Sequence, residues 1–448
     1  MSDPLISTAE QSVPQAGSPG ETPGHTSAHR SLWHHSDYLK LWLAATVSLM
    51  GSQVSQLAIP FIAAVVLTSS ALEVAMLGAV EMAPFILFAL PAGAWLDRVR
   101  RRPVMIAGDL GRGLALLSIP IAYAAGVLTI WQLYAVGFVT GSLTVLFDVA
   151  DQSYLPAILE RADLVEGNAK LSLPQSSAQI VGPGFGGGLI GLLGAPFAVV
   201  VDAASFFASG ALIALIRKPE PKPERQLASD GTHTNLRQEI GEGLRYVLGN
   251  RYLRMIAGST ATSNLGTSIA FSIFPVFVYR ELGLSVALVG AIFGLGGLGV
   301  LLGAVISAPL SKKLGVGSAI VISMSLSGPA TMLIFLMPSE VPVAACLFLA
   351  SIFLTGFSAV VYNANQVSFR QAITPLEMQG RMNATMRFVV WGTIPVGSLI
   401  GGLLASFLPL RTTIGIGAAV AVTAFLWVLF SPVRSLREIP RDEAIRAD

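Results

Sequence analysis

Twelve apolar stretches constrain this chain more than any other feature, because each is long enough to cross a lipid bilayer. We expect them at about 39–66, 74–96, 103–126, 130–150, 168–193, 196–216, 255–278, 284–309, 316–337, 342–362, 384–408 and 412–432. A helix needs about 20 apolar residues to span the hydrocarbon. Helices or closed barrels satisfy the backbone there, and the short alternating runs of barrel strands are absent. The sequence therefore predicts an all-α integral membrane protein with twelve transmembrane helices.

The chain also resembles itself at one constant offset in residue number, from the first apolar stretch to the eleventh. The matching pairs are Ser48 and Ser263, Gly51 and Gly266, Pro60 and Pro275, Thr140-Gly141 and Thr355-Gly356, Asn168-Ala169 and Asn383-Ala384, Gly182 and Gly397, and Gly186-Gly187 and Gly401-Gly402. Repeated membrane halves are typical of carriers, whose substrate site lies between the halves near the bilayer midplane. We expect two pseudo-symmetric six-helix bundles around a central cavity.

Basic residues predict how the chain crosses the membrane. Of the 28 lysines and arginines, only Arg280 and Arg411 fall in the loops on one side, and nearly all the rest lie on the other. The positive-inside rule places the basic side, with both termini, in the cytoplasm of a cell membrane. The net charge of +2 thus reflects topology and gives no indication of nucleic-acid binding.

Composition divides the chain into five parts. We expect a disordered cytoplasmic tail at 1–36, a first bundle at 37–216, a linker at 217–254, a second bundle at 255–433 and a cytoplasmic tail at 434–448. Within the linker, an amphipathic helix that ends near Gly249 would carry four apolar residues on one face, namely Ile240, Leu244, Val247 and Leu248. This helix is either a spacer between the bundles or a regulatory element.

Other classes of function find little support. Cys346 is the sole cysteine, so a disulfide within the chain is impossible and we expect no metal. No phosphate-binding loop for ATP is present, and the five histidines do not cluster within the apolar stretches. We therefore expect neither an enzyme nor a cofactor, and the proton-motive force remains as the energy source.

The loop between the second and third spans, residues 93–102, reads Gly-Ala-Trp-Leu-Asp-Arg-Val-Arg-Arg-Arg. It resembles the signature loop of the major facilitator superfamily in spacing and position. The resemblance implies a conformational latch in the outward-facing state, formed by Gly93, Asp97, Arg98, Arg101, Arg102 and Asp148. Asp97 would lie at the N-terminus of span eleven, where the helix dipole favours a negative charge, and Arg101 would pair with Asp148.

Span five contains a glycine motif with members Gly182, Pro183, Gly186 and Gly187. It is similar to the G-P-x-x-G-G motif of the antiporter branch of that superfamily, and the similarity implies export. The alternative interpretation is a general packing motif, because small residues let helices approach closely and proline bends a helix.

A wider resemblance covers all twelve spans. It is carried by segments 81–85, 147–156, 168–169, 202–206 and 380–384, which look like the macrolide-efflux and enterobactin-exporter branch of drug–proton antiporters. It implies a small amphipathic substrate, a protein surrounded by membrane lipids, and no use of ATP. We expect a monomer.

Acidic residues inside the spans all lie in the first half: Glu81, Asp109, Asp148, Asp151 and Asp202, the last expected near the outer end of span six. A charge in the hydrocarbon costs at least ~2.5 kcal/mol, so these acids are functional candidates. We favour Glu81 for proton coupling because no basic partner lies at helical spacing. Asp109 and Arg112 are further candidates for proton coupling, although their spacing of three residues also suits a permanent ion pair.

Polar and aromatic residues of spans one, seven and ten are candidates for the substrate cavity, because these spans line it in the superfamily. The candidates are Gln53, Gln56, Asn264, Phe271, Asn363 and Gln366, with the last two in span ten or the loop just after it. Their character fits neutral or cationic amphiphiles.

The sequence therefore predicts proton-coupled efflux of amphipathic drug-like or natural-product compounds by alternating access. Two alternatives within the superfamily are a siderophore exporter and a metabolite importer. A ligand-sensing membrane receptor is the alternative without transport.

Overall fold

The computed structural model describes residues 32–96, 99–160, 163–220 and 236–437, which form helices and short connections without a strand among them. The first half contains six long helices: α1 (Ser36–Phe61), α2 (Ala71–Leu96), α3 (Arg101–Ala124), α4 (Ile130–Ile158), α5 (Leu164–Leu193) and α6 (Ala195–Ala214). A π-helical turn, η2 (Ile62–Val66), continues α1, and a 3-10 turn, η1 (Leu32–His34), precedes it.

The second half forms six further spans from more, shorter pieces. Its elements are α8 (Arg251–Ser272), α9 (Phe274–Val276), the π-helical η4 (Phe277–Glu281), α10 (Val286–Gly296), α11 (Leu298–Leu314), α12 (Val316–Phe335), α13 (Val341–Ala372), α14 (Leu376–Trp391), α15 (Thr393–Ala405), α16 (Leu410–Leu429) and η5 (Pro432–Ser435). Spans eight and eleven are interrupted at Gly297 and Gly392. The predicted arrangement of twelve helices in two bundles is confirmed.

The repeat reappears in the helix boundaries. α1 begins at Ser36 and α8 at Arg251, and this spacing equals the one between Ser48 and Ser263 in the sequence repeat. The same spacing separates the starts of α2 and α10, of α3 and α12, and of α6 and α16, and it relates both ends of the two π-helical turns. Even the left-handed residue after each π turn is repeated, as Thr68 with φ +50° and Gly283 with φ +64°. The two halves are therefore structural copies of each other.

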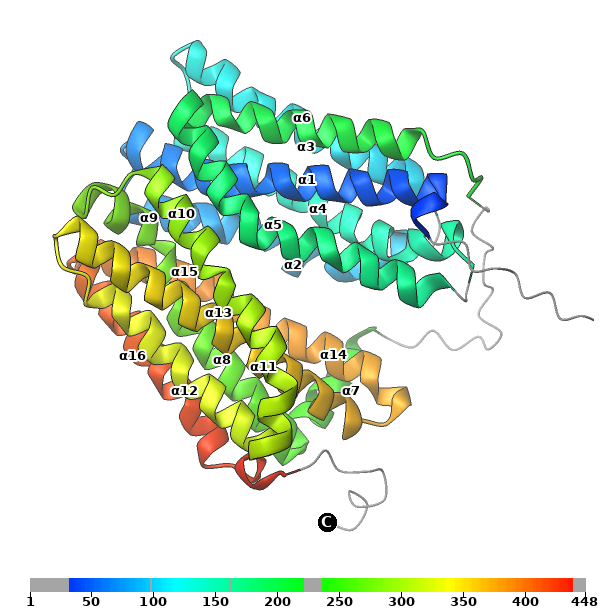
Figure 1. The fold of residues 1–448 in the computed structure, drawn as a ribbon, viewed down its shortest axis with the longest axis vertical. Helices are drawn as coiled ribbons and strands as arrows, with labels where there is room; N and C mark the ends of the chain where they lie inside the picture. The colour runs from blue at the N-terminus through cyan, green and yellow to red at the C-terminus, as the bar shows by residue number, and fades with distance from the viewer. Residues whose placement is uncertain (1–31, 97–98, 161–162, 221–235, 438–448) are drawn as a thin grey trace, which may run out of the picture.

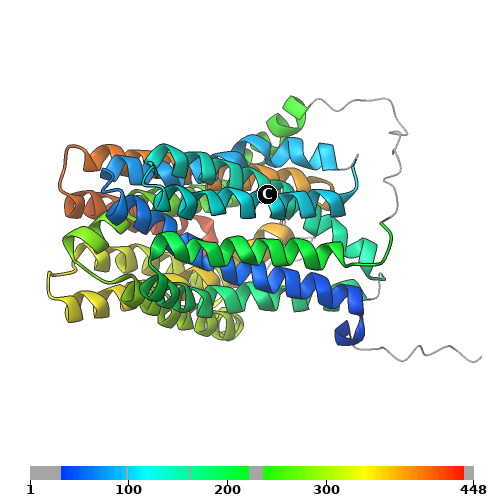
Figure 2. The ribbon, with the colours of Figure 1, turned by 90° about the horizontal axis from the view of Figure 1, so that it is seen from above.

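The halves meet at one end of the molecule and diverge toward the other (Figure 1). At the end that carries η2, η4 and the start of α10, called here the junction end, α5 packs against α10 and α2 against α15. The opposite end, called here the diverging end, carries the start of α3 and the linker helix. Viewed from above, the long helices of both halves run in roughly the same direction, as expected for helices that cross one bilayer (Figure 2).

The predicted linker helix is α7 (Leu236–Gly249), which packs against α14 and α8. Val247 is fully buried, whereas Leu244 and Leu248 are 39% and 45% exposed, so only part of the apolar face is covered. The side chain of Ile240 lies outside the described part of the chain. Glu242 of α7 forms an ion pair with Arg381 of α14 at 2.6 Å.

Hydropathy alone misplaced two helix ends. α4 continues to Ile158 and α13 to Ala372, past the predicted ends at 150 and 362. The last turns of these helices are polar, and hydropathy reports contact with lipid rather than helical structure. Asn363 and Gln366 consequently lie within α13, and the loop predicted for them is wrong.

One of the twelve spans is too polar to qualify by composition. Eleven helices among the described residues are long and apolar enough to cross a membrane, and α5 is not one of them. Exposed polar residues in the part of α5 nearer the diverging end explain the difference: Asn168, Ser172, Gln175, Ser176, Ser177 and Gln179. An exposed polar stripe on a transmembrane helix favours contact with water rather than lipid.

Candidate functional site

The glycine motif of α5 packs against two helices at once. A Cβ on Gly182 would lie 2.3 Å from Cγ of Gln53, and one on Gly186 would lie 3.1 Å from the Gln53 carbonyl oxygen, both on α1. Gly187 faces α10 of the second half, where an added Cβ would lie 2.9 Å from Cα of Gly290. Only glycine permits approaches this close. The motif therefore joins α5 to its own half and to the other half.

The contact with α10 extends over three turns. The carbonyl oxygen of Pro183 would lie 2.4 Å from a Cβ on Gly290. Further along, Gly294 and Gly297 face Ile180. A Cβ on Gly294 would lie 3.2 Å from the Ile180 carbonyl oxygen, and a Cβ on Gly297 would lie 3.2 Å from the Ile180 Cα. We call this contact between α5 and α10 the glycine seam. The glycine seam supports the packing interpretation of the motif. It provides no evidence about the direction of transport.

Asp109 and Arg112 form the expected ion pair within α3. Nη2 of Arg112 lies 2.5 Å from Oδ1 of Asp109, and Arg112 and Asp109 are only 5% and 0% exposed. The guanidinium stacks on the rings of Phe147 and Phe206, at 4.4 and 4.2 Å from their centroids. Its charge is thus compensated inside the first bundle, and a role of the pair in proton coupling stays a prediction.

Asp202 is buried where α6 packs against α1. It is 2% exposed and two turns into α6, where Oγ of Ser205 donates to its Oδ1 at 3.2 Å. A Cβ on Gly51 of α1 would lie 2.8 Å from that oxygen. The expected place of Asp202 near the outer end of span six stays a prediction, and Gly51 lets α1 cover the acid.

Three of the five acids inside the spans have no hydrogen-bond or ion-pair partner within the described ranges: Glu81, Asp148 and Asp151. Glu81 is exposed and lies one turn beyond Leu77, which packs into the core of the first half. Asp148 is also exposed, and Asp151, one turn further along α4, is partly exposed. An unpaired carboxylate at membrane depth is costly when ionised, so each can bind a proton or a cationic group.

The repeat relates two of these acids to two predicted cavity residues. At the offset that pairs Ser48 with Ser263, Asp148 corresponds to Asn363 and Asp151 corresponds to Gln366. The second half therefore carries uncharged amides where the first half carries carboxylates. Aligning the two halves residue by residue would have revealed this relationship in the sequence.

The loop motif is described only in part. Gly93 lies within α2, whereas Asp97 and Arg98 lie outside the described residues. Arg101 and Arg102 are the first two residues of α3. The Nε of Arg102 donates to the carbonyl oxygen of Ile213 at 3.1 Å. The motif thus connects the start of α3 to the end of α6.

Glu220, which the sequence analysis did not single out, contacts the same motif. Its carboxylate accepts hydrogen bonds from the backbone nitrogens of Arg101 at 2.7 Å and Arg102 at 3.1 Å. Its Oε1 also lies 3.9 Å from Nη1 of Arg101. A carboxylate at a helix N-terminus satisfies free N–H groups and the helix dipole. In this conformation the partner of Arg101 is therefore Glu220, and the pairing with Asp148 is not formed. That pairing was expected for the outward-facing state and stays a prediction.

Two of the predicted cavity residues have structural partners. Gln53 packs against Gly182, and Nδ2 of Asn264 donates to the carbonyl oxygen of Val390 at 3.0 Å. Val390 lies two residues before the interruption of span eleven at Gly392. Asn264 thus binds α8 to the end of α14, a role that its position in span seven did not indicate.

The remaining predicted cavity residues differ in exposure. Gln56 and Asn363 are exposed, and Phe271 packs against Phe274 with ring centroids 5.4 Å apart. Gln366 is only 4% exposed and donates from Nε2 to Oδ1 of Asn363 at 3.2 Å. The exposed members are the better candidates for contact with a substrate in this conformation.

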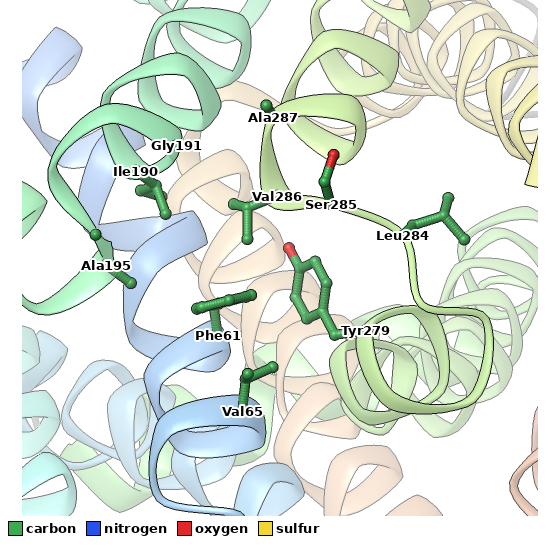
Figure 3. A pocket seen from close by; sticks show the side chains of 11 residues that line it. Phe61, Val65, Ile190, Gly191, Ala195, Tyr279, Leu284, Ser285, Val286 and Ala287 are labelled. Atoms are coloured by element: carbon green, nitrogen blue, oxygen red, sulfur yellow. The ribbon is translucent and has the colours of Figure 1, made fainter.

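A pocket of about 430 Å³ lies at the junction end, and none of the predicted cavity residues is among those that line it (Figure 3). Phe61 and Ile190 of the first half and Tyr279, Ser285 and Val286 of the second half are among its lining residues. Its walls are mainly apolar, and the Tyr279 hydroxyl points into it. No pattern in the sequence indicates this pocket, because its walls come together only where the halves meet.

Comparison with known proteins identifies related transporters. Residues 30–445 match a family model described as transmembrane secretion effector. The multidrug efflux pump Tap of Mycolicibacterium fortuitum is 28% identical over 355 residues, which cover 77% of this chain and 83% of that protein. Tap of Mycobacterium tuberculosis is 25% identical over 421 residues, which cover 90% of this chain and 95% of that protein.

Solved structures agree on the fold. A bacterial homologue of the iron transporter ferroportin, in its inward-facing state, superimposes with a TM-score of 0.71 at 17% identity. The match covers 89% of this chain and 99% of that one. At this identity the similarity establishes the twelve-helix architecture and no substrate.

Proposed function

The chain belongs to the transmembrane secretion effector family of the major facilitator superfamily, and from this premise we propose that it exports amphipathic compounds in exchange for protons. Its relatives named multidrug efflux pumps support export rather than uptake.

The observation that carries the proposal is the arrangement of the two halves. They are joined at the junction end by the glycine seam and diverge toward the other end (Figure 1). Alternating access requires two such bundles that rock about a site between them. This arrangement corresponds to one of the two states of that cycle.

We propose that the diverging end faces the cytoplasm. The start of α3 lies there with Arg101 and Arg102, whereas Arg280 and Arg411 lie at the junction end. The positive-inside rule then makes this the state that receives substrate from the cell interior. Both termini are cytoplasmic on this assignment.

The charges favour a neutral or cationic substrate. Asp148 and Glu81 are exposed and unpaired within the described ranges, and Arg112 is neutralised by Asp109. An anionic siderophore would lack a free arginine in the interior of the first bundle. We therefore prefer drug-like amphiphiles to the siderophore alternative.

Proton coupling is assigned to Glu81. An ionised carboxylate without a partner is costly at membrane depth, so conformations that hide it from water favour its protonated form. Proton binding and substrate binding would then alternate on one monomer, with no cofactor and no ATP.

The test is efflux of ethidium from energised cells that express the protein, with and without a protonophore. Cells that express Gly187→Leu at the same level are the matched control, because that side chain would enter the backbone of α10. We expect expression-dependent loss of dye that the protonophore stops. Dye accumulation above the control would indicate an importer, and specific binding without flux would indicate a receptor; either result would overturn the proposal.

A further inference from the structure

Arg280 crosses between the two halves at the junction end. It belongs to η4 of the second half, yet its Nε donates to the carbonyl oxygen of Ala64 at 2.5 Å and its Nη2 to that of Ser69 at 2.7 Å. Both carbonyls belong to the first half, where η2 ends. The fixed fork of a guanidinium suits two acceptors of this kind.

These carbonyls are available because of the way in which α1 ends. In the π-helical turn η2 the backbone nitrogen of Leu67 bonds to the Ile62 oxygen, and that of Ser69 to the Ala63 oxygen. The Ala64 oxygen accepts from Arg280 instead. A cation at a helix C-terminus is also favoured by the helix dipole. One side chain thus satisfies the end of α1 from the opposite half.

The turn that Arg280 contacts has an uncommon conformation. Thr68 precedes Ser69 and has a φ of +50°, in the left-handed region that β-branched residues rarely adopt. The equivalent position of the second half is Gly283, which adopts a similar φ without a side-chain clash. The turn at Thr68 therefore needs more stabilisation from neighbouring segments than the turn at Gly283 does. Arg280 supplies two hydrogen bonds to it.

The repeat also shows that the contact is one-sided. The equivalent of Arg280 in the first half is Val65, which cannot donate a hydrogen bond from its side chain. The aromatic contact of Phe61 with Tyr279, with centroids 4.9 Å apart, lies on the neighbouring turn and contributes no directed bond between the halves. The polar connection between η2 and η4 therefore comes from the second half.

Arg411 provides an internal comparison. It is the other arginine that the sequence assigns to this side, and its Nη1 donates to the carbonyl oxygen of Phe335 at 3.2 Å. Both residues belong to the second half, so this bond does not connect the halves. The two arginines share a charge and an end of the molecule and differ in whether they bridge the junction.

We propose that Arg280 is a positioning residue that holds the junction end closed while the other end is open. The inference rests on the proposed alternating access and not on any particular substrate. For substrate to leave at the junction end, η2 and η4 must separate, and Arg280 must release both carbonyls. Its two charge-assisted hydrogen bonds therefore shift the balance between the two states of the transporter.

The experiment measures the distance between two spin labels across the junction end in purified full-length protein. One label occupies the native Cys346 of α13, and the other occupies Trp131→Cys of α4, which is the equivalent position of the first half and is 73% exposed. Arg280→Met removes both hydrogen bonds. Arg411→Met in the same labelled background is the control.

Loss of two charge-assisted hydrogen bonds should raise the population with a separated junction by about tenfold or more. Arg411→Met should retain the parent distribution. Arg280→Lys, which keeps the charge without the fork, should lie between the two and serves if the methionine variant is unstable. Unchanged distances in both Arg280 variants, or equal shifts in the Arg280 and Arg411 variants, would overturn the proposal. No substrate is required, so absence of efflux would count against the proposed function alone.

Discussion

Gly187 of α5 and Gly290 of α10 touch backbone to backbone across the junction, and the repeat places a second contact in the equivalent position. A Cβ on Gly187 would lie 2.9 Å from Cα of Gly290. The repeat equivalents of this pair are Gly402 of α15 and Ala75 of α2, where a Cβ on Gly402 would lie 2.7 Å from Cβ of Ala75. The two contacts between the halves are thus related by the internal symmetry of the chain.

Gly187→Ala should weaken this junction. The added methyl group would meet backbone atoms of α10, and overpacking of this kind costs about 1–3 kcal/mol. We expect efflux of ethidium to fall at least several-fold, with normal expression in the membrane. Gly188→Ala is the matched control, because nothing lies within 4 Å of a Cβ at that position. Equal activity of the two variants would contradict a role for the glycine seam.

Asp109→Asn should destabilise the first bundle, because it leaves the buried Arg112 without its ion-pair partner. Breaking one side of a buried pair costs about 3–5 kcal/mol. The double variant Asp109→Leu with Arg112→Met removes both charges and should recover a large part of the loss. Thermal unfolding in detergent measures both effects. If the double variant is as unstable as Asp109→Asn, the two charges must stabilise the bundle through contacts other than their own ion pair.

Gly243→Leu should release the linker helix from the second half. A Cβ at this position would lie 2.4 Å from Oγ1 of Thr385 and 3.0 Å from the carbonyl oxygen of Arg381. We expect faster hydrogen exchange across 236–249, with efflux retained if the helix is a spacer. Gly241→Leu is the control, because nothing lies within 4 Å of its added Cβ. Loss of efflux in Gly243→Leu alone would favour the regulatory interpretation.

Exchanging the residues after the two π-helical turns should change stability in opposite directions. A non-glycine residue in the left-handed region costs about 1–2 kcal/mol. Gly283→Thr should therefore lower the melting temperature in detergent. Thr68→Gly should raise it slightly, since glycine removes the clash but gains freedom in the unfolded chain. A lower melting temperature for Thr68→Gly would show that the threonine side chain itself is required.

Much of the architecture follows from the apolar stretches and the repeat, because crossing a bilayer imposes helix length and hydrophobicity. The sequence could not show where α4 and α13 end, since Asp151 and Gln366 continue each helix beyond its apolar part. It also treated span eleven as one helix. At the interruption near Gly392, the carbonyl oxygen of Val390 accepts hydrogen bonds from Thr393 of the same span and from Asn264 of another span.

The candidate site was less accessible to sequence reasoning, because its polar contacts join distant segments. The ion pair of Asp109 with Arg112 is local, and helical spacing predicted it. Glu220 lies 119 residues from Arg101, and no local pattern connects them. In the sequence, Arg280 stood out only as one of the two basic residues on the side of the membrane that is poor in lysine and arginine. Its two acceptors are backbone carbonyls, which any sequence would provide.

Proton-driven transport in proteoliposomes tests the central claim most directly. With an imposed pH gradient, the wild-type protein should concentrate ethidium against its gradient as protons move the other way. Glu81→Gln should lose this concentrative transport but retain exchange of ethidium down its gradient. Glu166→Gln, at the half-exposed carboxylate that pairs with Lys170 on α5, should behave as wild type. Full concentrative transport by Glu81→Gln would contradict the assignment of Glu81, and a wild-type protein indifferent to the pH gradient would contradict proton-coupled export itself.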